Sequence, residues 1–321
     1  VAVYKNAAYD MRYYNRLQMF VHANALEQNV TNLQNGQLAL FVRIGSDYNN
    51  NFYEYEIPLS LTAPGTYNTY SVADCRAVWP EANMLDINLK KLTALKKERN
   101  RKKAIGLASF NAIYSEYDSD NQSNKLSIVG NPSLGEVKVL MIGVRNNSPE
   151  VKAGEVWVNE LRMLEPESDG GWAAAANLNV QLSDFGNVAA SGKYISDGYG
   201  GLEQKVLERT TDKYGSYTVT TNFELGKFFP DKAKVSIPVY YSVTREKTTP
   251  KYNPLDTDML LDDALESAEN EHEKDSIRSI AVTNTVSKNF SVSGMRVGIA
   301  TKRHPMPYDP ANFSFSYSRS D

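Results

Sequence analysis

Long apolar segments are missing from the sequence, because no run approaches the roughly 18 apolar residues that a transmembrane helix requires. This absence excludes a helical membrane protein, so such a chain can cross a bilayer only with the strands of a closed barrel. The single cysteine, Cys75, permits no internal disulfide. The formal net charge of -3 gives no reason to expect a nucleic-acid partner.

Metal-binding patterns are also missing. The three histidines, His22, His272 and His304, have no metal-ligand spacing among them. We expect His22 inside a strand of a β-sandwich and the other two in water. Cys75 has no neighbouring histidine or glycine-rich turn that would activate it, so we expect an inert, partly buried thiol.

Catalytic motifs are absent in the same way. There is no Gly-x-Ser-x-Gly motif and no phosphate-cradling loop. Glu54 and Glu56 are spaced to share one strand face, as the acidic pair of a glycosidase does, but a polar face in water explains them as well. We therefore predict that the chain is not an enzyme and has no cofactor.

Oxygen-bearing side chains alternate in residues 118–124, as in a calcium-binding loop. The EF-hand pattern fails, because Ser123 replaces the turn glycine and Val129 stands where the bidentate glutamate belongs. We expect a polar hairpin loop there, with calcium at Asp118 and Asp120 as the alternative.

Residues 1–165 predict a soluble, jelly-roll-like β-sandwich. Apolar residues alternate with others in runs bounded by Gly, Asn and Pro, and one such run carries Leu38, Leu40, Val42 and Ile44 on one face. A second sheet would bury this stripe. The predicted strands are 14–25, 37–46, 52–62, 136–146 and 155–163.

One helix is predicted at 84–103, with Asn83 as its N-cap. Its end, residues 96–103, is the one strongly basic run. We expect a solvated helix end whose cations suit the negative end of the helix dipole. Binding of nucleic acid or an anionic surface is the alternative.

Residues 170–321 alternate between apolar and polar side chains in runs about as long as a membrane-crossing strand, which needs roughly 9–11 residues. The pattern predicts seven antiparallel strands of a large, incomplete transmembrane β-barrel, so the fold class is all-β with a minor helix. The predicted strands are 172–182, 187–194, 214–225, 233–245, 279–286, 290–301 and 312–319.

The period of two assigns each side chain to one of two faces. The predicted lumen-facing residues are Asn177, Asn179, Gln181, Thr218, Thr220, Asn222 and Glu224. The predicted lipid-facing residues are Leu178, Val180, Val219, Phe223, Leu225, Val235, Ile237 and Val239.

The connections between these predicted strands alternate in length. Segments 183–186, 226–232 and 287–289 are short, whereas segments 195–213, 246–278 and 302–311 are long. Outer-membrane barrels have short periplasmic turns and longer outer loops. We therefore expect the long loops on the extracellular side, and the module 1–165 there too, because the chain enters the first strand from that side.

The longest loop has an amphipathic pattern at 256–268, after a turn-forming segment at 250–254. Four aspartates accompany it, and they would suit either a cation site or the acidic first turn of a solvated helix. We expect the solvated helix. The four are Asp256, Asp258, Asp262 and Asp263.

A secreted β-sandwich binding module, for carbohydrate for example, joined to a second soluble β domain is the alternative to the barrel. Alternation alone fits both, since a sandwich also buries one face of each sheet. The loop parity favours the barrel, as do aromatic residues near the predicted strand ends, which suit a membrane interface. These aromatic residues are Trp172, Tyr217, Phe228, Phe229 and Phe313.

Several motifs resemble the SprA/Sov family, the giant outer-membrane translocon proteins of the type IX secretion system, which are associated also with gliding motility. The resemblance runs from about residue 52 to the end and is most specific in the second half, where the motifs occur in the family's order. The motifs are residues 130–135, 137–145, 155–162, 170–174, 202–204, 224–230, 237–239 and 250–256.

The resemblance implies a single-chain barrel of about 36 strands, of which this chain would be an internal segment. The sequence begins at Val1 without an initiator methionine or signal peptide and ends inside a strand-like pattern, which also leads us to expect an internal segment. The implied location is the outer membrane. The implied partners are cargo proteins with C-terminal sorting domains, a smaller barrel of the PorV type, a periplasmic plug protein and outer-membrane lipid. The family has no catalytic residues to transfer.

Overall fold

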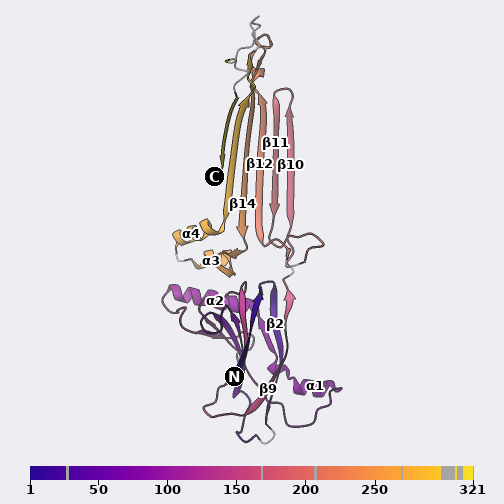
Figure 1. Cartoon of the computed structure of the whole chain (residues 1–321), viewed down its shortest axis with the longest axis vertical. Helices are drawn as coiled ribbons and strands as arrows, with labels where there is room; N and C mark the ends of the chain where they lie inside the picture. Colours follow the sequence, from indigo (N-terminus) through magenta and orange to yellow (C-terminus); the bar gives the residue numbers. More distant parts are fainter. Residues whose placement is uncertain are drawn as a thin grey trace. The chain divides into compact units, whose positions relative to one another are not determined.

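The computed structural model describes residues 1–26, 29–167, 169–205, 208–268, 270–297, 308 and 314–320. The chain divides into two compact units (Figure 1). The first contains Val1–Ser168 and Tyr252–Lys274, and the second contains Asp169–Lys251 and Asp275–Asp321. Within the described residues, no helix is both long and apolar enough to span a membrane.

The first unit contains a six-stranded antiparallel sheet and a three-stranded antiparallel sheet. The larger sheet has the order β1 (Ala2–Tyr9), β8 (Val137–Asn146), β3 (Leu38–Gly45), β4 (Phe52–Pro58), β7 (Lys125–Val129) and β6 (Tyr114–Tyr117). The smaller sheet has the order β5 (Leu85–Asn88), β2 (Tyr14–Ala25) and β9 (Gly154–Pro166).

The two sheets share one apolar core, which confirms the predicted sandwich. Val42 of β3 and Val21 of β2 are both buried in it, and the whole predicted stripe of β3 is buried. Leu92 of helix α2 (Leu89–Ala104) packs into the same core. Alternation along each strand therefore gives each sheet one apolar side, and the two sides meet.

The helix begins later than predicted. The residues before it form the 3-10 helix η1 (Glu81–Asn83) and strand β5, and the side chain of Asn88 caps α2 by accepting a hydrogen bond from the Lys90 N–H. Asn83 is instead buried. Its Nδ2 donates a hydrogen bond to the Ser60 carbonyl, and its Oδ1 accepts one from the Ser60 N–H. A short helix that was not predicted, α1 (Val72–Val78), is capped by Ser71.

Residues 252–267, here called the connector, belong to the first unit. They form β15 (Tyr252–Asn253), β16 (Asp256–Leu260) and α3 (Leu261–Ser267). The sequence predicted an outer loop with a solvated helix, but Asp256 and Asp258 lie in a strand, and Met259, Leu261 and Ala264 are buried. Helix α4 (Glu271–Ala281) then leads into the second unit.

The second unit contains a six-stranded antiparallel sheet with strands in sequence order (Figure 1). Its strands are β10 (Ala173–Leu182), β11 (Gly186–Ile195), β12 (Asp212–Glu224), β14 (Pro238–Pro250), β17 (Thr283–Ser293) and β19 (Ser314–Ser320). No described strand pairs with the outer edge of β10 or of β19, so the sheet is open.

Among the described residues this sheet has six strands, whereas the sequence predicted seven. Parts of predicted strands 279–286 and 290–301 form one strand, β17 (Thr283–Ser293), which runs through the predicted turn 287–289. Residues 279–281 belong instead to α4, and residues 298–301 lie outside the described residues. Ser287, Lys288 and Asn289 pair with β14 on one side and β19 on the other. Two neighbouring strands therefore hold extended a segment whose composition favours a turn.

The corrected strands change the connection lengths. Residues 183–185, 225–237 and 294–313 join strands at one end of the sheet, and residues 196–211 and 251–282 join them at the other. Predicted loop 302–311 comes between β17 and β19 in the chain, and all of it except Tyr308 lies outside the described residues. The strict alternation of short and long connections therefore does not hold.

The connection between β12 and β14 contains three short elements. These are η3 (Leu225–Phe228), η4 (Asp231–Ala233) and β13 (Val235–Ser236). Strand β13 pairs with β18 (Arg296–Val297) in a separate two-stranded sheet. Predicted strand 233–245 therefore enters the six-stranded sheet only at Pro238.

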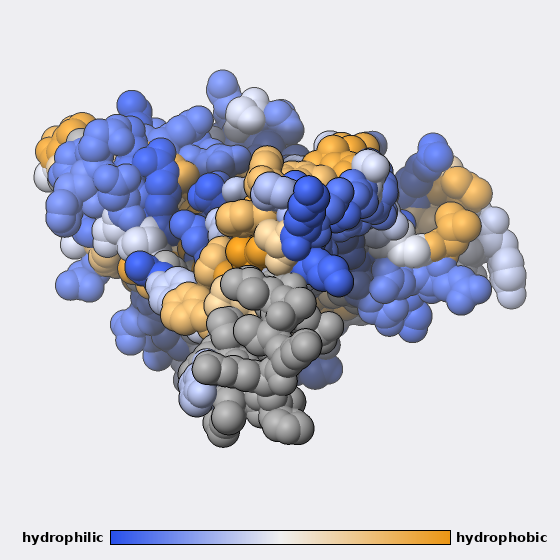
Figure 2. All heavy atoms as spheres, turned by 90° about the horizontal axis from the view of Figure 1, so that it is seen from above, coloured by the Kyte–Doolittle hydropathy of each residue, from blue (hydrophilic) through white to orange (hydrophobic). Residues whose placement is uncertain are grey.

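Apolar side chains also reach the surface. In the space-filling view they gather in separate patches among hydrophilic residues (Figure 2).

Candidate functional site

One face of the sheet in the second unit is apolar. Phe223 of β12 lies opposite Val239 of β14, which lies opposite Val292 of β17. Directly opposed residues of neighbouring strands point to the same side of a sheet. In a parallel row, Val219 lies opposite Val243. We call this side of the sheet the apolar face.

The apolar face is exposed. Leu178 of β10 has 61% of its surface accessible, and Phe315 of β19 has 58%. Contiguous apolar surface of this kind marks a contact with lipid or with another protein.

Aromatic side chains meet near both ends of this sheet. At one end, the rings of Trp172 and Tyr194 lie 4.8 Å apart. At the other end, Phe185 lies in the turn after β10, and its ring centre is 5.3 Å from that of Phe223 and 5.1 Å from that of Phe228. Among the aromatic residues predicted near strand ends, Tyr217 instead lies inside β12, and Phe313 is outside the described residues.

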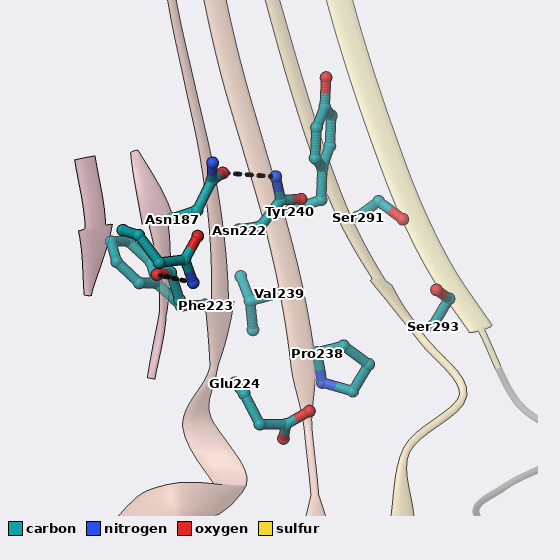
Figure 3. Close-up of a pocket in the computed structure, with 11 residues that line it drawn as sticks. Asn187, Asn222, Phe223, Glu224, Pro238, Val239, Tyr240, Ser291 and Ser293 are labelled. Atoms are coloured by element: carbon teal, nitrogen blue, oxygen red, sulfur yellow. Dashed lines mark hydrogen bonds between the residues drawn. The ribbon is translucent and has the colours of Figure 1, made fainter. Parts of the chain in front are cut away.

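The opposite side, here called the polar face, has cross-strand hydrogen bonds between side chains. Asn222 Nδ2 donates to Asn187 Oδ1 over 3.3 Å (Figure 3). Asn187 Nδ2 donates in turn to Asn179 Oδ1 over 2.8 Å. The hydroxyls of Thr218 and Thr244 are 3.0 Å apart. Amides and hydroxyls that bond only one another along a strand face retain free capacity to bind water.

A hollow of about 500 Å³ lies on the polar face near the turn after β10 (Figure 3). Glu224 borders it, but the carboxylate of Glu224 is already bound. It accepts hydrogen bonds from the backbone N–H of Gly226 over 3.1 Å, from Ser236 Oγ over 3.0 Å and from the N–H of Ile237. The hollow is lined by Gln181, Gly186, Asn187, Asn222, Phe223, Glu224, Pro238, Val239, Tyr240, Ser291 and Ser293.

The structure separates most of the residues that the sequence assigned to opposite faces. All seven predicted lumen-facing residues lie in β10 or β12 on the polar face: Asn177, Asn179, Gln181, Thr218, Thr220, Asn222 and Glu224. Five predicted lipid-facing residues lie on the apolar face: Leu178, Val180, Val219, Phe223 and Val239.

Three predicted lipid-facing residues are not in this sheet. Leu225 begins η3, Val235 lies in β13, and Ile237 stands between β13 and β14. The chain leaves the sheet after Glu224, where the Glu224 carboxylate accepts hydrogen bonds from the N–H of Gly226 in the next turn and from the N–H of Ile237 just before β14. Period-two assignment fails wherever the strand itself ends.

Cations on the apolar face were not predicted. On β14, Arg245 lies opposite Tyr217 and Lys247 opposite Gly215. Lys288 of β17 lies opposite Val243, and Arg319 of β19 lies opposite Lys288. The apolar face is therefore interrupted by charge on β14 as well as on β17 and β19. The false turn prediction at 287–289 hid Lys288 from the sequence analysis.

The first unit contains a buried ion cluster between α2 and the connector. Lys96 Nζ donates to Asp258 Oδ1 over 2.8 Å, to the Pro132 carbonyl over 2.7 Å and to Asp256 Oδ1. The Lys96 side chain is 0% exposed and that of Asp258 is 1% exposed. All three donors of the ammonium group are therefore used.

The rest of the Asp258 carboxylate is also bound. Asp258 Oδ2 accepts from Tyr53 Oη over 2.7 Å and from the Leu134 N–H over 2.9 Å. Burial and the Asp258 carboxylate raise the pKa of Tyr53 well above its usual value. Burial also raises the pKa of Asp256, with Lys96 opposing the shift and Asp258 adding to it.

Further polar contacts hold the connector on both sides of this cluster. Arg12 Nη1 donates to the Thr257 carbonyl over 2.7 Å, and the Arg12 guanidinium lies 4.5 Å from the centre of the Tyr252 ring. Nearer α3, Lys97 Nζ lies 2.6 Å from Asp263. The connector is thus bound to the sandwich over its whole length.

The basic run 96–103 is not the uniformly solvated helix end that was predicted. Lys96 and Arg99 are both fully buried. Arg99 Nη1 donates to the Gly130 carbonyl over 2.7 Å, and its guanidinium lies 4.5 Å from the centre of the Phe110 ring. These two positions face the core and the connector rather than water.

The acidic pair on β4 is paired with arginines. Glu54 is buried, 2.6 Å from Arg43 and 3.0 Å from Arg145, and Glu56 also contacts Arg145. The prediction of a water-exposed polar strand face was therefore wrong. Neighbouring strands supply the arginines, and their register cannot be read from the two glutamates.

At the hairpin loop 118–124, where calcium was the alternative, the cation beside Asp118 is the ammonium group of Lys91 from α2. Asp118 is buried, contacts Lys91 Nζ and accepts from Tyr55 Oη over 2.7 Å. Burial opposes ionisation of Asp118, but the hydrogen bonds from Lys91, Tyr55 and the Asp120 N–H together outweigh burial and lower the pKa of the carboxyl. In the described part of the chain, no group of three or more His, Cys, Asp or Glu residues could hold a metal ion.

His22 lies in β2, as predicted, with Nδ1 2.7 Å from the Val78 carbonyl. His272 lies on the exposed side of α4, and His304 is outside the described residues. Cys75 is exposed on α1, which corrects the prediction of a partly buried thiol.

A family described as motility related/secretion protein, SprA_N, matches residues 1–265. The chain belongs to this family. The SprA_N match covers the sandwich, strands β10 to β14, and the connector as far as α3. A search of curated proteins found no significant match.

Proposed function

We propose that this chain is a segment of a protein-conducting outer-membrane channel that exports folded cargo in type IX secretion and serves gliding motility. The six-stranded sheet forms part of the barrel wall. Its apolar face contacts lipid, and its polar face lines an aqueous lumen. Membership of a motility and secretion family supports this role.

The observation that carries the proposal is the contrast between the two faces. Rows of opposed apolar residues such as Phe223, Val239 and Val292 cross one side, while asparagines and threonines bond one another across the other. Outer-membrane barrels alternate in this way between lipid and lumen. In a wall of this kind the long side chains of Lys288 and Arg319 extend towards the polar boundary of the membrane.

Strand length and aromatic placement agree with a membrane wall. Strands β12 and β14 each have 13 residues, whereas a tilted strand crosses a bilayer with about 9–11. The ring pairs Trp172–Tyr194 and Phe185–Phe228 lie at opposite ends of the sheet, where the two membrane interfaces would be. No described strand pairs with the outer edges of β10 and β19. A barrel has no free edge, so the proposed wall needs further strands from a longer protein.

Connectivity supports an extracellular position for residues 1–165. The chain passes between the two units at 168/169, 251/252 and 274/275. All three passages lead to the same end of the sheet, opposite the short turn at 183–185. Short turns are periplasmic in outer-membrane barrels, so the proposal puts the sandwich outside.

The proposed partners follow from the channel role. They are cargo proteins with C-terminal sorting domains in the lumen, a PorV-type smaller barrel that receives cargo, a periplasmic plug protein, and outer-membrane lipid. The proposal assigns the chain no catalytic step.

Cysteine labelling tests the sidedness. Cys75 is exposed on α1 of the sandwich, so a membrane-impermeant maleimide should label it in intact cells, as detected by mass spectrometry of its peptide. The matched control is Asp184→Cys in the turn after β10, where the native side chain is 70% exposed. Position 184 should be labelled only after the outer membrane is permeabilised. The reverse pattern would contradict the proposal.

Detergent dependence separates the channel from the alternative, a secreted β-sandwich binding module joined to a second soluble β domain. The chain 1–321 should need detergent to remain monodisperse, because its apolar face is exposed. A soluble monomer with native β content in plain buffer would support the binding module and reject the barrel wall.

A further inference from the structure

Strand β9 has a free hydrogen-bonding edge. In the three-stranded sheet it pairs with β2 on one side, and no described strand pairs with its other side. Positive φ angles at Glu160 and Glu165 interrupt the strand, which leaves 154–159 as its regular part. A regular, uncovered edge is a template for pairing with another strand.

The outer side of this sheet has an apolar groove beside that edge. Val21 of β2 is buried in the core, so its neighbours Phe20 and His22 point away from the core. Helix α1 crosses above them, since the Val78 carbonyl contacts His22 Nδ1 and Trp79 lies 6.0 Å from the His22 ring.

The groove has a volume of about 420 Å³, and both β9 and α1 line it. Its lining includes Phe20 of β2, Asn159 and Glu160 of β9, Val72 and Arg76 of α1, and Trp79. Phe20 lies directly opposite Asn159. A strand added to the free edge of β9 would continue this row and direct alternate side chains to the face of the groove.

The groove is lined by one acidic and one basic side chain, Glu160 and Arg76, and only the acidic one has an ion-pair partner among the described residues. Glu160 is neutralised by Arg162. Arg76 is exposed and forms no ion pair within the described residues. The groove therefore has one uncompensated positive charge beside apolar surface, and a carboxylate on the occupant would neutralise it.

We propose that β9 and α1 form a docking site for an extended segment of a separate polypeptide. The segment adds a strand to residues 154–159, places alternate apolar side chains in the groove and directs one carboxylate to Arg76. Backbone hydrogen bonds supply affinity in this mode of recognition, and pockets for alternate side chains supply specificity. The free edge favours a polypeptide over a sugar, because a sugar cannot satisfy a row of backbone groups. The site does not depend on a membrane location of the chain.

The test uses the whole chain and a fluorescent peptide, Thr-Val-Thr-Leu-Thr-Asp, in an anisotropy titration. Two further peptides have N-methyl groups on the odd or on the even residues. Only one edge of an added strand faces β9, so one methylated peptide should lose binding on the order of tenfold while the other binds like the parent. Equal binding of both methylated peptides overturns strand addition.

Charge reversal tests the carboxylate. Arg76→Glu should weaken the parent peptide and strengthen a version that ends in Lys. The control, Lys138→Glu, makes the same charge change on β8 of the other sheet and should leave both affinities unchanged. No binding of the parent peptide up to about 1 mM, or equal effects of the two substitutions, overturns the site.

Discussion

Lys96 Nζ lies 2.8 Å from Asp258 Oδ1, although the two residues are 162 positions apart in the chain. The pair joins the helix of the sandwich to the connection between two strands of the other unit's sheet. The connector is therefore part of the sandwich core rather than a surface loop. Removal of one partner would leave the other charge buried without compensation.

Lys96→Met should destabilise the first unit strongly. Asp256 and Asp258 would lose their shared cation inside the protein, and loss of one partner of a buried ion pair costs about 3–5 kcal/mol. Denaturant unfolding of the whole chain measures the change. Lys97→Met is the matched control, since Lys97 pairs with the connector at the surface with 39% of its side chain exposed; it should cost under about 1 kcal/mol. Equal losses would contradict the buried pair.

The pKa of Asp47 should lie well below its usual value. Burial opposes its ionisation, but bonds from the N–H groups of Asn49, Asn50 and Asn51 and from the Asn51 amide outweigh burial and lower its pKa to about 2. The folded-state pKa of Asp47 is below its unfolded value of about 3.9. The ionised carboxylate therefore stabilises the folded state fully above about pH 3.9, and this stabilisation disappears as the pH falls towards 2.

Comparison of the protein with Asp47→Ala checks this pH dependence. The difference in unfolding free energy should be constant near neutral pH and shrink below about pH 4. A difference that does not change between pH 7 and pH 3 would show that the carboxylate charge is not responsible.

Gly130→Ala should cost more than Gly106→Ala. Both glycines have a positive φ, +70° and +75°. A side chain at either position pays about 1–2 kcal/mol for the left-handed backbone. At Gly130 the added Cβ would also overlap the Asn50 carbonyl oxygen and the Asn51 side chain, whereas at Gly106 no atom lies within 4 Å. We expect about 2–5 kcal/mol at Gly130, and equal unfolding free energies for the two variants would contradict the close packing.

Val219→Arg and Thr220→Arg test the two faces of the sheet. If the apolar face contacts lipid near mid-bilayer, arginine at Val219 costs about 2–4 kcal/mol. Arginine at Thr220, on the polar face, should be tolerated in a wide aqueous lumen. The measurement is folding into membranes from denaturant. Equal tolerance at the two neighbouring positions would reject the proposed environments of the faces.

In the sheet of the second unit, the alternation of apolar and polar residues was enough to predict the strands that alternate strictly. In β10 and β12, a change of face at every residue assigned Val219 and Thr220 to opposite sides, and the register with β11 and β14 agrees. Pattern failed at Ser287–Asn289, because pairing on both sides holds a turn-like sequence extended. It failed again at Leu225, where the bound Glu224 carboxylate ends the strand.

The sequence by itself determined the β class, the two-part organisation and the separation of most apolar and polar side chains, because alternation depends only on neighbouring residues. Only the tertiary structure decided that Lys96 and Asp258 form a buried pair, that Glu54 is neutralised by arginines, and that the connector belongs to the sandwich. Each of these results depends on which distant strands and helices become neighbours. That choice is made by burial of a shared core and by satisfaction of buried charges, neither of which is a property of a local segment.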